Sequence, residues 1–182
     1  MSLCFEGFLA FDLRPDTPSQ IKDTLSYLTR SEEYALNEAP PHPFFEVPGW
    51  RQFLQIRSVD GGHPGLMWSH LAEVARPAPH GQTTPRLTLS FRRVMHDDIE
   101  FYELWRKFLS WIVPHIETDG FIGYYRETYS LHPVIVYSRD GHIFTGTPSS
   151  APKGESGEAW PGNPKYILPR WPKNEGKGYS TP

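Results

Sequence analysis

The sequence predicts an α+β fold: a two-layer sandwich with two helices against a mainly antiparallel sheet, in a ferredoxin-like βαββαβ order with extra strands. The first observation is a strand–loop–helix pattern that occurs twice, with Phe11 and Phe91 at corresponding places 80 positions apart. The second is a group of three short strand-like stretches late in the chain, at 121–129, 134–138 and 142–146. The third is an Asp-Gly pair between the last two stretches, which accepts the positive φ angles of a tight hairpin turn.

The first half of the chain predicts a strand, a helix and a long irregular region. Residues 5–13 alternate in the way of a strand, with apolar side chains on both faces. Residues 17–20, Thr-Pro-Ser-Gln, have the form of a capping box, in which the Thr17 hydroxyl accepts from the first turn of the helix. Residues 35–50 are predicted as a proline-rich loop, with a short edge strand at 44–47. A strand at 50–59, a short helix at 66–75 and a further loop at 76–85 are predicted to follow.

The second half predicts a strand at 87–94 and a helix at 98–117, with Asp97 or Asp98 as the helix cap. This second helix is apolar around most of its circumference. A helix of that kind is buried on more than one side. We therefore expect the sheet to cover one side, and the C-terminal tail or a partner chain to cover another.

The chain is predicted to form one α+β domain over 1–146, with two βα units that start near residues 5 and 87. Residues 147–182 form a tail that is rich in proline and glycine, which predicts no regular secondary structure. The tail also carries aromatic residues, including Trp160 and Trp171, which disordered tails usually lack. We therefore expect the tail to wrap the domain.

Composition and charge exclude some classes of function. The net charge is −3 at pH 7, which argues against general binding of nucleic acid. The chain has one cysteine, Cys4, so the fold needs no intramolecular disulfide. No apolar run approaches the length of a membrane span. We expect a cytoplasmic protein that has no contact with membranes.

No catalytic signature stands out, and we assign no catalytic residue, metal ion or cofactor. His96 and Asp97 lie between a strand and a helix, where they could serve acid–base chemistry. A helix-cap role is favoured for Asp97, because the first helix has a capping residue in the corresponding place. The histidines at 63, 70 and 80 match no standard spacing of a zinc site.

A binding surface is predicted on one face of the sheet. If strands 87–94 and 121–129 are neighbours, one face carries a polar, aromatic and cationic set: Thr88, Ser90, Arg92, Tyr124, Arg126 and Thr128. Such a face suits an anionic ligand, single-stranded RNA or a protein partner, and a solvated face is the equal alternative. The residues that we assign to binding are Arg92, Tyr124, Arg126, Trp68, Trp105 and Trp111.

The interpretation that we favour is a non-enzymatic protein-binding module, because tryptophan, tyrosine and arginine concentrate binding energy at interfaces. In size, acidic charge and aromatic content the chain resembles the immunity proteins of bacterial toxin systems. That resemblance implies an inhibitor that neutralises one cognate toxin, often a basic nuclease. A second copy of the chain is the other protein partner that we consider.

The alternative is a small-molecule enzyme. The second half, with the order strand–helix–strand–strand–strand, is similar to the module of the glyoxalase and vicinal-oxygen-chelate family. That resemblance implies a metal-dependent reaction, with Glu127 and His142 as the nearest candidates for metal ligands. The first half departs from the module, because it has only one or two strands after its helix.

Overall fold

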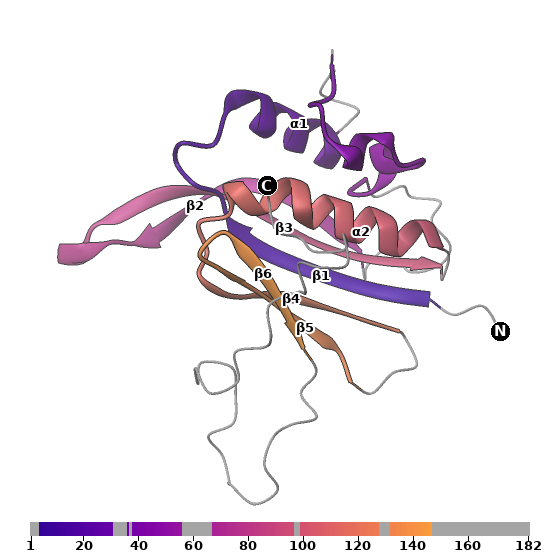
Figure 1. Cartoon of the computed structure of the whole chain (residues 1–182). Coiled ribbons are helices and arrows are strands. Elements are labelled where there is room, and N and C mark those ends of the chain that lie inside the picture. The colour runs from indigo at the N-terminus through magenta and orange to yellow at the C-terminus, as the bar shows by residue number, and fades with distance from the viewer. Residues whose placement is uncertain are drawn as a thin grey trace, which may run out of the picture.

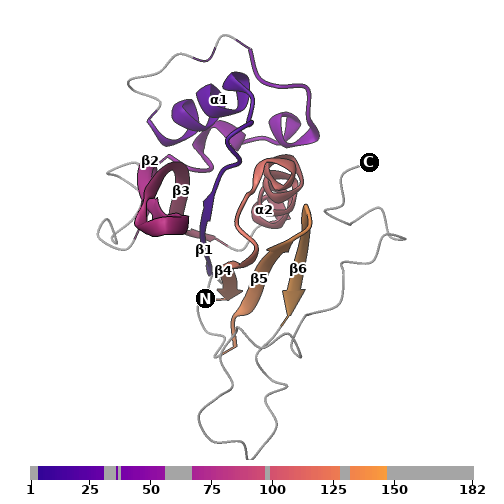
Figure 2. The same ribbon diagram turned by 90° about the vertical axis from the view of Figure 1, so that its left-hand side faces the viewer.

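The computed structural model is a mixed helix and strand domain with a six-stranded sheet and two α-helices. It describes residues 4–30, 36, 38–55, 67–96, 99–127 and 132–146. Both α-helices lie on the same face of the sheet (Figures 1 and 2). The main elements are β1 (Cys4–Asp12), α1 (Ser19–Thr29), β2 (Trp68–Pro77), β3 (Thr83–His96), α2 (Ile99–Ile112), β4 (Gly120–Glu127), β5 (Val134–Arg139) and β6 (His142–Gly146).

The strands lie in the order β2-β3-β1-β4-β5-β6, and every neighbouring pair is antiparallel. The condition set for the binding face, that the strands at 87–94 and 121–129 are neighbours, is not met, because β1 lies between β3 and β4. The N-terminal strand takes this central place because it is apolar on both faces. Leu9 and Phe11 are fully or almost fully buried beneath the helices.

The repeat in the sequence corresponds to a repeat of elements. The α-helices begin at Ser19 and Ile99, 80 positions apart, and the strands that precede them, β1 and β3, pair along nine residues. The capping prediction for Thr17 is wrong. The N-cap of α1 is Pro18 without a side-chain hydrogen bond, and the buried Thr17 hydroxyl has no partner among the described residues. The cap of α2 at 97–98 lies outside the described residues.

Two stretches have a secondary structure different from the one predicted. The expected helix at 66–75 is largely the edge strand β2, whose ten residues all pair with β3. Helix-forming residues such as Leu71 and Ala72 are overridden there by the ladder with β3. The expected strand at 50–59 begins as a 3₁₀ turn, η2 (Trp50–Gln52). Its buried residues are Trp50, Phe53 and Leu54, a spacing of three and four that suits a helical turn.

A segment of the first half covers the second side of α2. This segment includes η1 (Pro43–Glu46), a 3₁₀ turn where an edge strand was expected, and continues through η2. The Phe44 ring stacks on Trp111 at 5.7 Å between centroids and meets Phe108 edge-on at 5.5 Å. The expectation that only the tail or a partner chain could provide this cover is therefore wrong. The tail itself, 147–182, lies outside the described residues.

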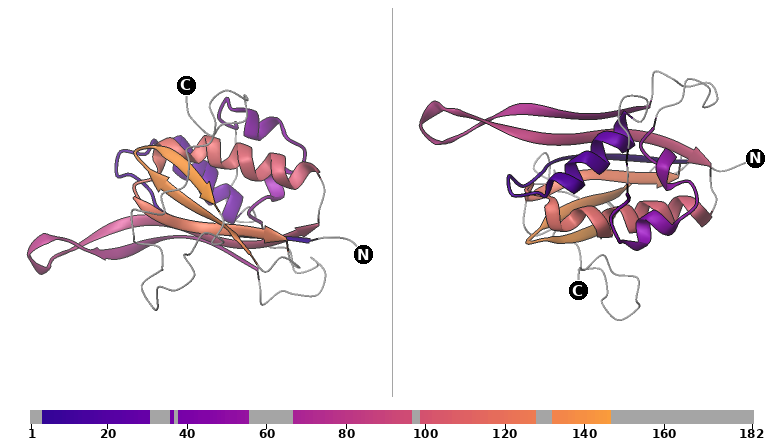
Figure 3. Two further views of the ribbon diagram at one scale, coloured as in Figure 1. Left: turned by 60° about the horizontal axis from the view of Figure 1, so that its bottom comes forward. Right: turned by 90° about the horizontal axis from the view of Figure 1, so that it is seen from above.

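The remaining strands follow the prediction closely. The three strands after α2 are present as β4, β5 and β6. The turn between β5 and β6 has φ values of 50° at Asp140 and 69° at Gly141, as the Asp-Gly pair predicts. The expected loop at 76–85 is mostly hairpin, because the β2–β3 ladder runs to the pair Pro77–Thr83. The end of this hairpin projects beyond the body of the domain (Figure 3).

In the described part of the chain, neither α-helix has both the length and the apolar character that crossing a membrane requires.

Candidate binding face of the sheet

The face of the sheet that points away from the helices, called here the outer face, carries the candidate site. Side chains alternate along a strand, so Phe5, Leu9 and Phe11 of β1 join the core while Glu6 and Phe8 lie on the outer face. The residues that concern us there are Glu6, Phe8, Trp68, Arg92, Tyr124 and Arg126.

Glu6 is the centre of a polar cluster on the outer face. Its side chain is only 4% exposed, although it lies in a strand with no helix above it. One carboxylate oxygen accepts from Arg92 Nε at 2.9 Å and from the Tyr124 hydroxyl at 2.6 Å. The other accepts from Arg126 Nε at 3.0 Å and from Nη2 at 2.8 Å. Both oxygens are therefore satisfied by charged or phenolic donors from the strands on either side.

These contacts set the protonation state of the cluster. Burial by itself would raise the pKa of Glu6, but the hydrogen bonds from Tyr124, Arg92 and Arg126 outweigh it and lower that pKa to about 2. Burial and the bond to Glu6 raise the pKa of the Tyr124 hydroxyl. At neutral pH the cluster thus holds one carboxylate, two guanidinium groups and a protonated phenol, an excess of positive charge.

An aromatic row crosses the strands beside this cluster. Trp68, Arg92, Phe8 and Tyr124 are successive partners across β2, β3, β1 and β4. The Phe8 ring lies 6.0 Å from the Trp68 ring and 5.7 Å from the Tyr124 ring, measured between centroids. The Trp68 side of the row faces solvent, with 40% of that residue exposed. The row and the cluster together form a mixed aromatic and cationic surface.

A second ion pair fixes the same face nearer to the projecting hairpin. Arg76 of β2 donates to both carboxylate oxygens of Asp12, at 2.7 and 2.8 Å, and Thr88 of β3 donates to one of them at 2.5 Å. Burial acts to raise the pKa of Asp12, and the bonds from Arg76 and Thr88 lower it overall. This pair links the edge strand β2 to the central strand β1 and supports the face on which Trp68 lies.

The structure brings together four of the six residues that were assigned to binding. Arg92, Tyr124 and Arg126 converge on Glu6, and Trp68 joins the aromatic row of the same face. Trp105 and Trp111, by contrast, are buried in the core, 2% and 4% exposed. Trp105 packs toward the sheet against Phe91 and Tyr125. Trp111 packs on the other side of α2, against Phe44 of η1. Thr128, part of the expected face, lies outside the described residues.

Sequence reasoning missed Glu6 and Phe8, which hold the site together. The signal for Glu6 was present, because it is a lone carboxylate near the start of an otherwise apolar strand. A charge in such a strand is rarely buried without a partner, and the cations of the other strands were already singled out. The missing information was that β1 lies between those strands.

The two residues implied as metal ligands by the glyoxalase-like order are not brought together. Glu127 is the last residue of β4, and His142 is the first residue of β6. The start of β6 pairs with the end of β5, and the end of β5 pairs with the start of β4, so His142 lies near the opposite end of β4 from Glu127. The length of β4, about 20 Å, therefore separates them. Among the described residues, no three His, Cys, Asp or Glu side chains gather closely enough to hold a metal ion.

Comparison of the chain with models of protein families, with curated proteins and with solved structures gave no significant match.

Proposed function

We propose that this protein is a non-enzymatic protein-binding module whose partner docks on the outer face of the sheet. The observation that carries the proposal is the exposed Trp68 ring in contact with Phe8, in a row that continues to Tyr124 beside two buried or half-buried arginines. Trp, Tyr and Arg are the residues that most often supply binding energy at interfaces. Apolar surface rimmed by polar and charged side chains, as around Trp68 and Phe8, is the pattern that marks interaction sites.

The chemistry of the face describes the partner surface that fits it. The Glu6 carboxylate is saturated by its three neighbours, so it has little capacity left for a partner. The Arg126 side chain is 37% exposed and retains donor groups that face solvent. We therefore propose a partner that brings a carboxylate to Arg126 and an apolar side chain to Trp68.

The substitution Trp68→Ala tests this proposal. Trp68 lies on an edge strand and is exposed, so its removal should leave the unfolding transition within about 1 kcal/mol of the wild type. Binding should weaken about 30-fold or more, as for an aromatic hot spot. The readout is mass spectrometry of proteins retained from the native lysate by the wild type and by the variant, followed by calorimetry with each purified protein.

Tyr102→Ala is the matched control, because Tyr102 is a comparably exposed aromatic on α2, on the other side of the sheet. A partner that Trp68→Ala and Tyr102→Ala both retain would contradict the proposed face. Retention of the same chain, with a concentration-dependent mass in solution, would identify a second copy as the partner.

The narrower proposal is that the partner is a bacterial toxin and that this protein neutralises it. Its support is the resemblance in size, acidic charge and aromatic content, together with the binding face described above. The test is expression of the product of the neighbouring gene with and without this protein. Growth that is arrested by the neighbour and restored by this protein, but not by its Trp68→Ala variant, is the expected result. A harmless neighbour would count against the toxin.

Two further proposals concern the fold and the location of the protein. We propose a ferredoxin-like arrangement extended by β5 and β6, supported by the sheet order β2-β3-β1-β4 and by the two βα units. We also propose a cytoplasmic location, supported by a chain with one cysteine whose fold depends on no disulfide. Fractionation of the native cells tests the location.

A further inference from the structure

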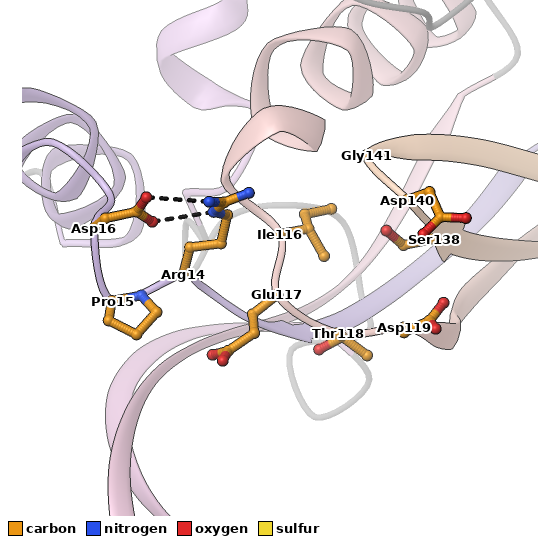
Figure 4. Close-up of a pocket in the computed structure, with 10 residues that line it drawn as sticks. All are labelled: Arg14, Pro15, Asp16, Ile116, Glu117, Thr118, Asp119, Ser138, Asp140 and Gly141. Atoms are coloured by element: carbon orange, nitrogen blue, oxygen red, sulfur yellow. Dashed lines mark hydrogen bonds and ion pairs between the residues drawn. The ribbon is translucent and has the colours of Figure 1, made fainter.

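A second candidate site lies at one end of the sheet, away from the Glu6 cluster. Three connections meet there: the one after β1, the one before β4 and the hairpin turn between β5 and β6 (Figure 4). They enclose a pocket of about 580 Å³, within the range of sizes that small-molecule sites occupy. The lining residues are Arg14, Pro15, Asp16, Ile116, Glu117, Thr118, Asp119, Ser138, Asp140 and Gly141.

The pocket is acidic. Four of its lining residues are carboxylates and one is a guanidinium. Asp16 is paired with Arg14 at 3.0 Å, and Glu117 is paired with Arg86 at 2.9 Å. The carboxylates on the opposite wall, Asp119 and Asp140 (Figure 4), are less fully paired with cationic side chains.

Asp140 on that wall lies 3.9 Å from Arg139, a loose contact, and its side chain is 85% exposed. Asp119 forms no ion pair with any residue that the structure describes. The wall formed by Asp119 and Asp140 therefore presents negative charge that the protein itself does not neutralise.

A hydroxyl in the same wall opens into the pocket. Ser138 is only 2% exposed, yet it lines the pocket and faces Ile116 and Arg14 across it (Figure 4). Its hydroxyl bonds to no residue that the structure describes, and its oxygen is not fully enclosed, so it is reached from the pocket. A hydroxyl without a protein partner is free to bond with whatever occupies the pocket. The Ser138 oxygen can accept from a donor that enters the pocket.

We propose that this pocket binds an organic cation that carries a guanidinium or ammonium group. The charged group donates to Asp119, Asp140 and the Ser138 hydroxyl, while its alkyl stem packs on Ile116 and Pro15 at the pocket floor and rim. A cation with several N–H donors satisfies acceptors of this kind in a way that no anion or neutral apolar group does. The ligand is either a free amine or an arginine or lysine side chain of another protein.

The experiment uses the full chain, ¹⁵N-labelled, with agmatine as the probe, because agmatine carries a guanidinium and an ammonium on one alkyl stem. We expect saturable amide shifts at residues 116–119 and 138–141. Asp119→Asn should weaken binding about fivefold, the usual scale for an exposed ion pair. Ser138→Ala should weaken it about threefold, the scale of one hydrogen bond. Ser138→Ala should leave the unfolding midpoint unchanged, since the hydroxyl has no partner to lose.

Asp23→Asn is the matched control, because it removes the same charge from an exposed position on α1 that does not line the pocket. Equal weakening by Asp119→Asn and Asp23→Asn would show non-specific attraction and overturn the proposal. So would an absence of shifts, shifts elsewhere, or stronger shifts with magnesium or calcium chloride than with agmatine. Binding of an arginine-containing peptide more tightly than agmatine would identify a protein side chain as the ligand, and the reverse order a free amine.

Discussion

At the scale of single residues, Glu6 shows how surroundings decide whether a charge belongs in a sheet. Removing a carboxylate from water is costly, and only saturation of both oxygens offsets that cost. Arg92 and Arg126 come from β3 and β4, which flank β1 on its two sides. Glu6 therefore acts as an electrostatic link across three strands, and it fixes the two guanidinium groups at the candidate binding face.

We expect Glu6→Ala to destabilise the protein by about 3 kcal/mol, because two neighbouring guanidinium groups then lose their shared partner. Urea unfolding monitored by circular dichroism measures this loss. Glu127→Ala is the control, since Glu127 is an exposed carboxylate at the end of β4 and its loss should cost less than about 0.5 kcal/mol. A similar loss in both variants would contradict the role of Glu6 as the link.

The lowered pKa of Glu6 also predicts how stability depends on pH. In the unfolded chain the carboxyl has its ordinary pKa of 4.5, and in the folded protein about 2. The unfolded chain therefore takes up the proton first as the pH falls. The stabilisation is complete above about pH 4.5 and is lost progressively down to about pH 2, a change on the order of 3 kcal/mol.

Urea unfolding of the wild type and of Glu6→Gln across this acidic range checks the prediction. The variant should show a shallower decline in the free energy of unfolding. It should keep the part due to Asp12, whose pKa is lowered as well. Parallel curves for the two proteins would show that Glu6 does not carry the acid sensitivity.

At the scale of elements, the burial of α2 on two sides shows how the first half of the chain completes the core. A helix apolar on most sides can be stable only if two layers bury it. The sheet is one layer, and the aromatic segment with η1 and η2 is the other. Phe44 of η1 lies fully buried against α2, in contact with five aromatic rings.

We expect Phe44→Ala to cost about 3 to 5 kcal/mol, as truncation of a buried phenylalanine generally does. The half-buried neighbour Phe45 provides the comparison. Phe45→Ala should cost clearly less, because part of that ring is already in water. Thermal and urea unfolding of both variants measure the difference, and the reverse order would contradict the packing described here.

At the scale of the whole molecule, the tail and the aromatic segment are competing covers for α2. Because the contacts of the aromatic segment already fill one side of α2, we expect a chain that ends at Thr147 to remain folded. Its loss of stability should be smaller than that of Phe44→Ala. Unfolding curves and sedimentation of the shortened chain measure stability and solubility. A larger loss, or aggregation, would support the wrapping tail that the sequence predicts.

Local patterns were sufficient to predict several parts of the fold. The apolar strand at 5–13, the two helix starts 80 positions apart and the Asp-Gly hairpin depend on neighbours in sequence, and each is present. The stretch at 66–75 was predicted as a helix because its pairing partner, β3, lies elsewhere in the chain. Pairing across a hairpin overrides the weak preference of single residues.

Parts of the candidate site could likewise be predicted from the sequence, and other parts depended on the tertiary structure. The sequence by itself determined the α+β class, the polar and cationic character of one face, and the choice of Arg92, Tyr124 and Arg126. Only the tertiary structure decided that β1 separates their strands, that Glu6 unites them, and that Trp105 and Trp111 lie in the core. The reason is physical: alternation along a strand fixes which face a side chain takes, while its partners depend on strand order, which non-local pairing decides.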